Sequence, residues 1–241
     1  MELKGAGSLV TGGSRGLGAA LGAELARRGA RVVLVARDAE ALRATVGGIR
    51  GMGGEAHALA WDVSSPGAPH EIAGAATGLV GPVDLLVHCA STLGPTPLPS
   101  LLDMPSDALD DVLRTNVVAP FRRTKAIAGS MAIRGQGLVV HVTSDASVVP
   151  YAGWGAYGAS KAALDQLGRI WGEELKGTGV RFLSVDPGEM DTEMHAAALP
   201  EADRGTLAKP QEIAARIAFM LLDETIPTGA RIEVASWRPA A

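Results

Sequence analysis

Several features are scarce in this 241-residue sequence, and each scarcity excludes a class of protein. Its single cysteine, Cys89, cannot form an internal disulfide, and together with five scattered histidines it makes no Cys/His metal cluster. No uninterrupted apolar run reaches the roughly eighteen residues of a membrane span, and the first residues lack the basic and apolar regions of a secretion signal. We therefore expect a cytoplasmic protein with no metal and no membrane contact.

The charge balance excludes another class. Lys and Arg number 22 against 26 Asp and Glu, a formal net charge of -4, so the chain has no basic field for a phosphate backbone, and nucleic acid is not an expected partner. Hydrophobic residues make up 47%, enough for a buried core. Without a repeat, linker or low-complexity tail, the sequence predicts a single domain over residues 1–241.

Short β-branched and leucine-rich runs alternate with helical patterns along the chain. Nearly continuous apolar runs are typical of strands buried on both faces, and alternation with helices predicts right-handed βαβ units. We expect an α/β fold, a single Rossmann-like, doubly wound parallel sheet of about seven strands with helices on both faces. A (β/α)₈ barrel is the alternative at this length. The expected strands are 8–11, 31–36, 56–63, 83–90, 137–144, 180–186 and 230–235, and the expected helices are 16–28, 39–52, 69–80, 107–134, 157–176 and 211–222.

A glycine-rich turn, TGGSRGLG from Thr11 to Gly18, follows the first expected strand and leads into a helix. Glycines there permit a tight turn and close approach of the backbone to a pyrophosphate, which the N–H groups of the helix N-terminus would face. The spacing is G-x-x-x-G-x-G and not the commoner G-x-G-x-x-G, so a plain strand-to-helix turn is the alternative reading.

The end of the second expected strand bears on the choice of cofactor. An acidic residue at this place normally accepts the ribose 2′-hydroxyl of NAD, but here Ala36 is followed by Arg37. Arg37 and Arg15 both suit a 2′-phosphate, which predicts NADP(H), with NAD(H) the less favoured cofactor because Asp38 could still bind a ribose hydroxyl.

Tyr157 and Lys161 stand at i and i+4 of an expected helix and therefore share one face. A phenol has a pKa of about 10, and a neighbouring ammonium favours the phenolate and lowers that value. The pair could transfer a proton, or it could be an ordinary surface contact. Ser144, thirteen residues before Tyr157, and Asn116 in the fourth expected helix favour the first reading.

Together these motifs resemble the short-chain dehydrogenase/reductase family over nearly the full chain. The elements that match in order and separation are Thr11-Gly12-x-x-x-Gly16-x-Gly18, Asp62-Val63, Asn116, Ser144, Tyr157-x-x-x-Lys161 and Pro187-Gly188-x-x-x-Thr192. The resemblance implies hydride transfer between a nicotinamide and a ketone, aldehyde or secondary alcohol, and assembly as a homodimer or homotetramer.

The resemblance also implies roles for individual residues. Tyr157 would be the general acid or base, Ser144 would hydrogen-bond the reacting oxygen, and Lys161 would bind the nicotinamide ribose and lower the pKa of the phenol. Asn116 would hold a water that links Lys161 to solvent. The residues expected to bind the cofactor are Gly12, Ser14, Arg15, Gly16, Leu17, Gly18, Arg37, Asp62, Val63, Ala90, Asn116, Tyr157, Lys161, Pro187, Gly188, Met190 and Thr192.

Two of the departures from the family lie at the expected site. Where the family has Asn-Asn-Ala-Gly, this chain has His88-Cys89-Ala90-Ser91, and we expect His88 and Cys89 to be packed core residues without reactive chemistry. Glu189 stands where an apolar residue is more usual, so it either attracts a cationic or hydroxyl-rich substrate or is merely solvated.

The two long connections, 91–106 and 187–210, each follow a strand and are the expected walls of a pocket. Segment 190–209 either closes over the nicotinamide as a lid or seals the sheet edge. Leu93 and Met190 are further candidates for the wall. The residues expected to contact substrate are Ser144, Trp154, Tyr157, Glu189 and Met194.

The sequence thus predicts an NADP(H)-dependent oxidoreductase. An epimerase or dehydratase of the same fold is less consistent with 241 residues, because such relatives generally carry a longer C-terminal substrate domain. The alternative from another class is a catalytically silent NADP(H)-binding sensor or interaction protein, which would be expected to lose the tyrosine or the lysine.

Overall fold

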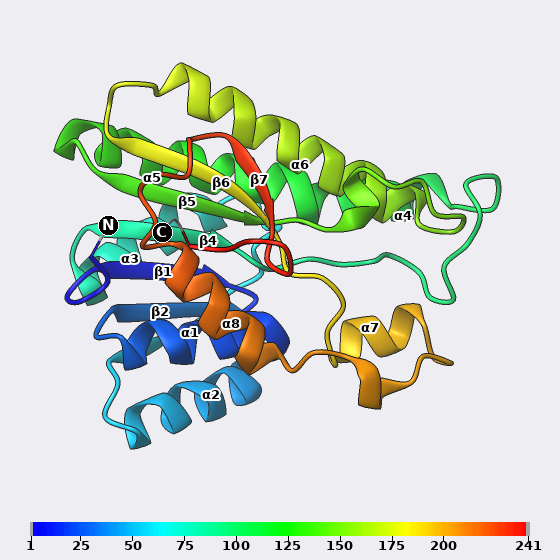
Figure 1. Cartoon of the computed structure of the whole chain (residues 1–241), viewed down its shortest axis with the longest axis horizontal. Helices are drawn as coiled ribbons and strands as arrows, with labels where there is room; N and C mark the ends of the chain where they lie inside the picture. The colour runs from blue at the N-terminus through cyan, green and yellow to red at the C-terminus, as the bar shows by residue number, and fades with distance from the viewer. Residues whose placement is uncertain (1, 240–241) are drawn as a thin grey trace.

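The computed structural model describes residues 2–239, and these form one sheet of seven parallel strands in the order β3-β2-β1-β4-β5-β6-β7 (Figure 1). The sheet is open, with β3 and β7 at its edges, which excludes the barrel and confirms the doubly wound fold. The strands are β1 (Gly7–Thr11), β2 (Arg31–Ala36), β3 (Ala56–Ala60), β4 (Val83–His88), β5 (Gly137–Val142), β6 (Val180–Asp186) and β7 (Ala230–Glu233).

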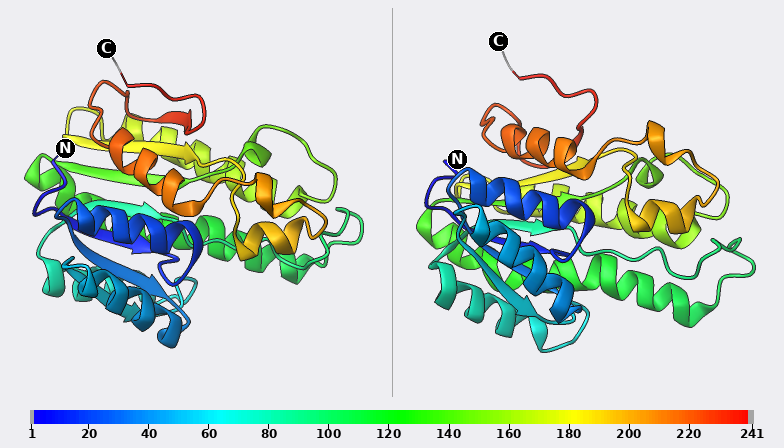
Figure 2. Two further views of the ribbon diagram at one scale, coloured as in Figure 1. Left: turned by 60° about the horizontal axis from the view of Figure 1, so that its bottom comes forward. Right: turned by 90° about the horizontal axis from the view of Figure 1, so that it is seen from below.

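Helices cover both faces of the sheet. Helices α1, α2 and α8 pack on one face, as Figure 2 shows, and α3, α5 and α6 pack on the other. The longer helices are α1 (Gly16–Arg27), α2 (Ala39–Gly51), α3 (Ala68–Val80), α4 (Ser106–Leu113), α5 (Ala119–Arg134), α6 (Gly155–Glu174) and α8 (Pro210–Met220).

Strand side chains alternate between two hydrophobic clusters. Val10 and Leu34 belong to the cluster under α1, α2 and α8, whereas Leu9 and Val33 belong to the cluster under α3, α5 and α6, and all four are fully buried. Burial on both faces explains the continuous apolar runs in the sequence. It also leaves only the ends of the strands open to a ligand.

The helix expected over 107–134 is interrupted. A π-helical turn at Arg114–Val118 separates α4 from α5 and contains Asn116. The Asn116 amide donates to the carbonyl of Thr92 at 2.8 Å and to Ser160 Oγ at 2.9 Å, and its oxygen accepts the Thr92 N–H. Such turns place one extra residue in the helix and re-aim a side chain, here into a buried polar junction.

Segment 190–209, expected either as a lid or as a seal of the sheet edge, contains a short helix, α7 (Glu193–Ala198), whose N-terminus is capped by Thr192 Oγ1. Figure 1 shows α7 beyond the arrowheads of the strands, on the side of the molecule where they end. Within residues 2–239, no helix is both long enough and apolar enough to cross a membrane.

The close contact between α1 and the glycine turn predicts a cost for any side chain at Gly18. A Cβ there would lie 2.3 Å from the carbonyl oxygen of Gly12, so helix and turn would have to separate. We expect Gly18→Ala to lower the free energy of unfolding by about 1–3 kcal/mol. Urea denaturation followed by circular dichroism measures this change.

Gly48→Ala is the matched control, because a Cβ at Gly48 in α2 meets nothing within 4 Å. This substitution should instead raise stability by about 0.5–1 kcal/mol, the usual gain of alanine over glycine inside a helix. Equal unfolding midpoints for the two variants would contradict the contact.

Candidate active site

A cleft of about 2240 Å³ opens at the carboxyl ends of the strands. It brings together the glycine turn, the segments that follow β4, β5 and β6, the first turns of α6, and helix α7. Of the residues predicted to bind cofactor or substrate, Asn116 alone does not line it. The predicted residues that do line it are Gly12, Ser14, Arg15, Gly16, Leu17, Gly18, Arg37, Asp62, Val63, Ala90, Ser144, Trp154, Tyr157, Lys161, Pro187, Gly188, Glu189, Met190, Thr192 and Met194.

The hydroxyl of Thr11 fastens the glycine turn to the end of β4. It donates to the carbonyl of Val87 and accepts the N–H groups of Cys89 and Ala90, both at 3.1 Å. Gly12 has φ +72° and lies so close to Ala90 that a Cβ would approach its Cα to 2.9 Å. Only glycine fits both the conformation and the space, and the turn is left exposed toward the cleft.

The N-terminus of α1 suits an anion. Its N-cap residue Arg15 makes no capping hydrogen bond with its side chain, and the first turn contains no acidic residue. The first N–H groups of the helix therefore have no carboxylate partner, and together with the helix dipole they favour a negatively charged ligand. A pyrophosphate fits this part of the cleft.

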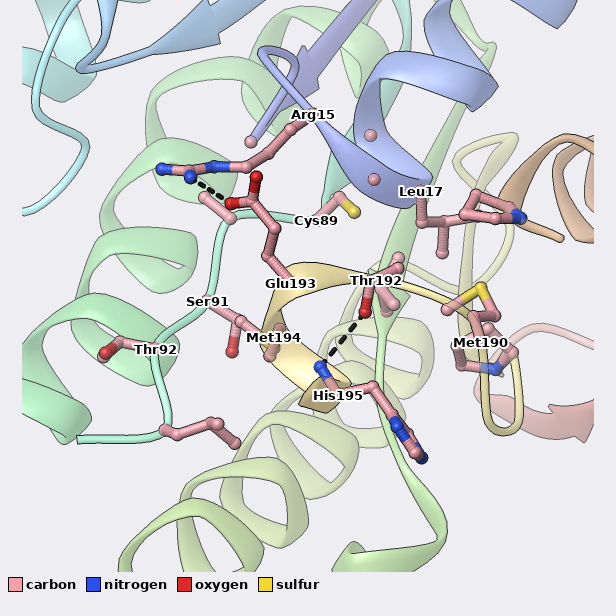
Figure 3. Close-up of a pocket in the computed structure, with 18 of the residues that line it drawn as sticks. Arg15, Leu17, Cys89, Ser91, Thr92, Met190, Thr192, Glu193, Met194 and His195 are labelled. Atoms are coloured by element: carbon pink, nitrogen blue, oxygen red, sulfur yellow. Dashed lines mark hydrogen bonds and ion pairs between the residues drawn. The ribbon is translucent and has the colours of Figure 1, made fainter. Parts of the chain in front are cut away.

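Two arginines flank this end of the cleft. Arg15 pairs with Glu193 of α7, so the glycine turn and the lid segment, residues 190–209, are joined across the opening (Figure 3). Arg37 lines the cleft beyond β2. Asp38 caps α2, because its Oδ1 accepts the N–H groups of Glu40 and Ala41 at 3.1 and 3.0 Å.

Tyr157 and Lys161 lie at the inner end of the cleft and are 8% and 2% exposed. Lys161 Nζ donates to the carbonyl of Val142 at 2.7 Å and lies 5.4 Å from the centre of the Tyr157 ring. Removal from water disfavours charge, and it lowers the pKa of Lys161 to about 8.

Burial shifts the pKa of Tyr157 in the opposite direction. It raises the pKa of the Tyr157 phenol above its ordinary value, and the hydrogen bond of the Ser144 side chain only partly opposes that increase. Asp186 and Asp145 raise the pKa further. The sequence suggested that Lys161 would lower it. In the structure desolvation dominates instead, so the phenol of the protein alone is protonated at neutral pH.

Ser144 belongs to a polar chain above Tyr157. Its hydroxyl donates to Asp145 Oδ1 at 2.9 Å, and Asp145 Oδ2 accepts the hydroxyl of Tyr151 at 2.8 Å. Trp154 contacts Tyr151 and Tyr157 edge to face, with ring centres 6.5 and 5.7 Å away. A small pocket with hydroxyl, carboxylate and aromatic walls thus faces the phenol.

Comparisons with known proteins agree with this arrangement. Residues 8–203 match the family described as short chain dehydrogenase. The chain belongs to the short chain dehydrogenase family. A short chain dehydrogenase of Pseudocercospora fijiensis is 38% identical over 200 residues, which cover 81% of this chain and 63% of that protein.

Two further relatives match more of their own length. The 3-oxoacyl-(acyl-carrier-protein) reductase FabG of Vibrio cholerae is 32% identical, and the match covers 93% of each chain. The structure of a single-residue variant of actinorhodin polyketide ketoreductase with NADPH superposes with a TM-score of 0.87 at 28% identity and covers 94% of each chain. These names place the chain among oxidoreductases.

The first departure from the short chain dehydrogenase pattern has a structural explanation. His88 is buried, as expected; its Nε2 lies 3.0 Å from Thr124 Oγ1 and its ring 5.3 Å from that of His141. Cys89 is not wholly core, since it lines the cleft. Burial raises the pKa of its thiol to about 11, so the thiolate is disfavoured at neutral pH.

The lid segment lines the cleft. The structure therefore favours the hypothesis that residues 190–209 form a lid, and not the alternative that they seal the sheet edge. Met190 pairs with Ala208 across its base, and Asp191 forms ion pairs with Arg204 and Lys209. Glu189 is largely exposed at the mouth, with Oε1 3.7 Å from His195 Nε2.

Arg231 of β7, which sequence reasoning missed, lies behind the cleft and contacts residues that line it. Its guanidinium reaches Asp186, Asp165 and the carbonyl of Ser144. The available signals were a cation in a strand expected to be buried and an aspartate directly before Pro187-Gly188, but neither identifies its partner.

The depressed pKa of Lys161 predicts a stability that depends on pH. Below pH 8 the folded and unfolded states both carry the ammonium, so the penalty for burying it is complete. Between pH 8 and 10.5 only the unfolded state keeps the proton, and the free energy of unfolding rises with pH by about 3 kcal/mol.

Urea unfolding of the wild type and of Lys161→Met across pH 7 to 11 isolates this contribution, because other titrating groups are common to both proteins. The wild type should gain stability relative to the variant as pH rises. If the free energies of unfolding of the two proteins changed in parallel with pH, the pKa of Lys161 would not be lowered in the folded state.

Proposed function

We propose that this short chain dehydrogenase is an NADP(H)-dependent reductase of ketones or aldehydes, with the reverse oxidation of secondary alcohols at high pH. One observation carries the proposal: Tyr157, Lys161 and Ser144 converge at the inner end of a cleft whose outer part has an uncapped helix N-terminus and two arginines. Charge, hydrogen bonding and proton transfer are thereby available in one place.

Tyr157 can act as the proton donor because its burial keeps the phenol protonated. When a carbonyl is reduced, negative charge develops on its oxygen, and a phenol that is still protonated can donate there. Ser144 stands beside Tyr157 as a second donor once its hydroxyl turns away from Asp145. The raised pKa keeps the phenol protonated at neutral pH, which is the form that can donate a proton to the developing alkoxide.

The residues of the cleft fit a nicotinamide dinucleotide. The α1 N-terminus would hold the pyrophosphate, Asp62 and Val63 would lie at the adenine, and Lys161 has further N–H groups to offer the ribose hydroxyls. The nicotinamide supplies the hydride when it is bound. Pro187 and Gly188 would lie at its far end.

The choice of NADP(H) over NAD(H) rests on Arg15, Arg37 and Asp38. Both arginines line the cleft and suit a 2′-phosphate. Oδ1 of Asp38 accepts two backbone N–H groups of α2, which leaves Oδ2 as the oxygen that a ribose hydroxyl could reach. The NADPH named with the related ketoreductase structure supports the same choice.

The pocket next to Tyr157 suits a small, uncharged or cationic carbonyl compound. Leu93, Trp154 and Met194 supply apolar wall. Asp145 and Glu189 are acidic, and the part of the chain that the structure describes shows no Lys or Arg within salt-bridge distance of either. An anionic substrate would meet repulsion at the mouth.

We also propose a homo-oligomer that buries the outer faces of α5 and α6. Apolar side chains stand exposed there, with Phe121 39%, Ile133 89% and Ile170 43% accessible. Phe121 contacts the ring of Trp171 at 5.9 Å, which gives the two helices a shared aromatic surface.

Tyr157→Phe tests the reaction. The variant should keep NADPH affinity within about twofold, because the ring remains, yet lose turnover by about 10²–10⁴ with the loss of the general acid. The measurement combines fluorescence titration of NADPH with NADPH oxidation over a panel of uncharged, cationic and anionic ketones and aldehydes.

Two other outcomes would overturn the proposal in different ways. Unchanged turnover in Tyr157→Phe would remove Tyr157 from the reaction. Tight NADPH binding by a wild type that reduces no carbonyl would favour the silent sensor.

The ion pair between Arg15 and Glu193 predicts how cofactor preference can be changed. Glu193 competes with a 2′-phosphate for the guanidinium, so Glu193→Gln should tighten NADPH binding about two- to fivefold, as expected for an exposed ion pair, and leave NADH nearly unchanged. Titration of both cofactors measures this preference.

Glu201→Gln is the matched control, because it removes one negative charge from the same lid segment at a position outside the cleft lining. Equal tightening by both variants, or equal effects on NADPH and NADH, would show that Arg15 does not meet the 2′-phosphate.

A further inference from the structure

Arg231 is an unusual residue for a strand at the edge of the sheet. It lies on β7 beside Ser184 of β6, and only 12% of its side chain is exposed. Its contacts lead away from solvent toward the segment after β5, the end of β6 and helix α6. The planar guanidinium has five N–H donors, so this one side chain can donate hydrogen bonds to all three segments at once.

The contacts of Arg231 are specific and short. Nη2 donates to Asp186 Oδ2 at 2.7 Å and to the carbonyl oxygen of Ser144 at 3.0 Å. Nε faces Ser147 Oγ and Asp165 Oδ2, both at 3.4 Å. Nη1 reaches the exposed Glu233 at 3.3 Å, a contact of little consequence because water screens it.

Each partner belongs to a segment that carries site chemistry. Ser144 presents the hydroxyl beside Tyr157, and the bond from Arg231 fixes the carbonyl of that same residue. Asp186 precedes Pro187-Gly188, and its Oδ1 accepts the N–H of Gly188 at 3.0 Å. One carboxylate therefore holds the turn on one side and the guanidinium on the other.

Asp165 ties the same network to the catalytic helix. It lies one helical turn after Lys161 on α6, is 2% exposed, and accepts the hydroxyl of Ser147 at 2.7 Å. Without Arg231, Asp165 and Asp186 would be two buried carboxylates with no cation from residues 2–239 in direct contact, a costly arrangement in a low-dielectric site.

We infer that Arg231 is a positioning residue of the reaction: it fixes Ser144 and the turn after Asp186 relative to helix α6. Arg231 touches neither Tyr157 nor Lys161, so its effect passes through the backbone of Ser144 and through Asp186. This inference rests on the proposed function, but it makes a claim about backbone order that can be measured without turnover.

Arg181 provides the comparison that separates positioning from mere stabilisation. It lies on the neighbouring strand β6 and is also partly buried, and its guanidinium donates to the carbonyls of Asp223 and Ile226 at 3.0 and 2.8 Å. Its contacts secure a loop remote from the cleft. An arginine that only stabilises the sheet edge should behave like Arg181.

The test compares full-length Arg231→Met, Arg231→Lys and Arg181→Met. We expect Arg231→Met to lower kcat by about tenfold to a hundredfold, the usual cost of a misplaced catalytic group, with KM for the carbonyl and Kd for NADPH within about threefold. The kcat of Arg231→Lys should lie between those of Arg231→Met and the wild type, because an ammonium keeps the charge but cannot reproduce the planar set of N–H donors of the guanidinium. Arg181→Met should keep kcat while losing comparable thermal stability.

Amide hydrogen exchange of the same proteins gives a second readout. Arg231→Met should exchange faster over residues 143–149 and 186–189, and Arg181→Met only over residues 223–229. If Arg231→Met fails to fold, Arg231→Lys carries both measurements, with the same directions expected.

Three results would overturn the inference: equal kcat in the Arg231 variants and Arg181→Met, unchanged exchange over residues 143–149 and 186–189, or a kcat loss shared by all variants in proportion to stability. Failure of the proposed function has a different signature, since the wild type itself would then reduce no carbonyl while the exchange measurement still decides the role of Arg231.

Discussion

The buried ammonium of Lys161 is the constraint on which the rest of the site depends. A charge that is 2% exposed needs partners, and the structure supplies the carbonyl of Val142, the ring of Tyr157 and the nearby carboxylate of Asp165. Asp165 is buried in turn and needs a cation of its own, which Arg231 provides. The active-site polar groups thus form one connected set, and each compensates for the burial of another.

The fold was predictable because its signals are local. The expected strands 31–36 and 180–186 match β2 and β6 residue for residue, since a strand buried on both faces is mostly apolar, even though β6 also contains Arg181, Ser184 and Asp186. The glycine turn was also predictable. Glycine is required at positions 12 and 18 because a Cβ there would collide with backbone atoms that lie a few residues away or at the end of the neighbouring strand. The ends of β3, β4, β5 and β7 were predicted two or three residues too late, and after the first three strands the chain continues into the lining of the cleft.

The missed features depend on distant parts of the chain. Arg15 meets Glu193 across 178 residues and Arg231 meets Ser144 across 87, and a single sequence contains no signal for either pairing. Asn116 was recognised, yet its π-helical turn and its place behind the cleft follow from Thr92 and Ser160 packing against it. The pKa of Tyr157 was misjudged for the same reason, because desolvation is a sum over every segment that covers the ring.

The placement of Arg231 on β7 has a consequence for how the protein unfolds. This strand has four residues, none of them fully buried, and pairs on one side only, so it belongs to the part of a sheet that opens first in subglobal fluctuations. When β7 separates, Ser144 and Asp186 lose their shared partner while the central strands and the glycine turn remain intact. Mild denaturant should therefore release the segments of Ser144 and Asp186 at one end of the cleft while the glycine turn at the other end is still folded.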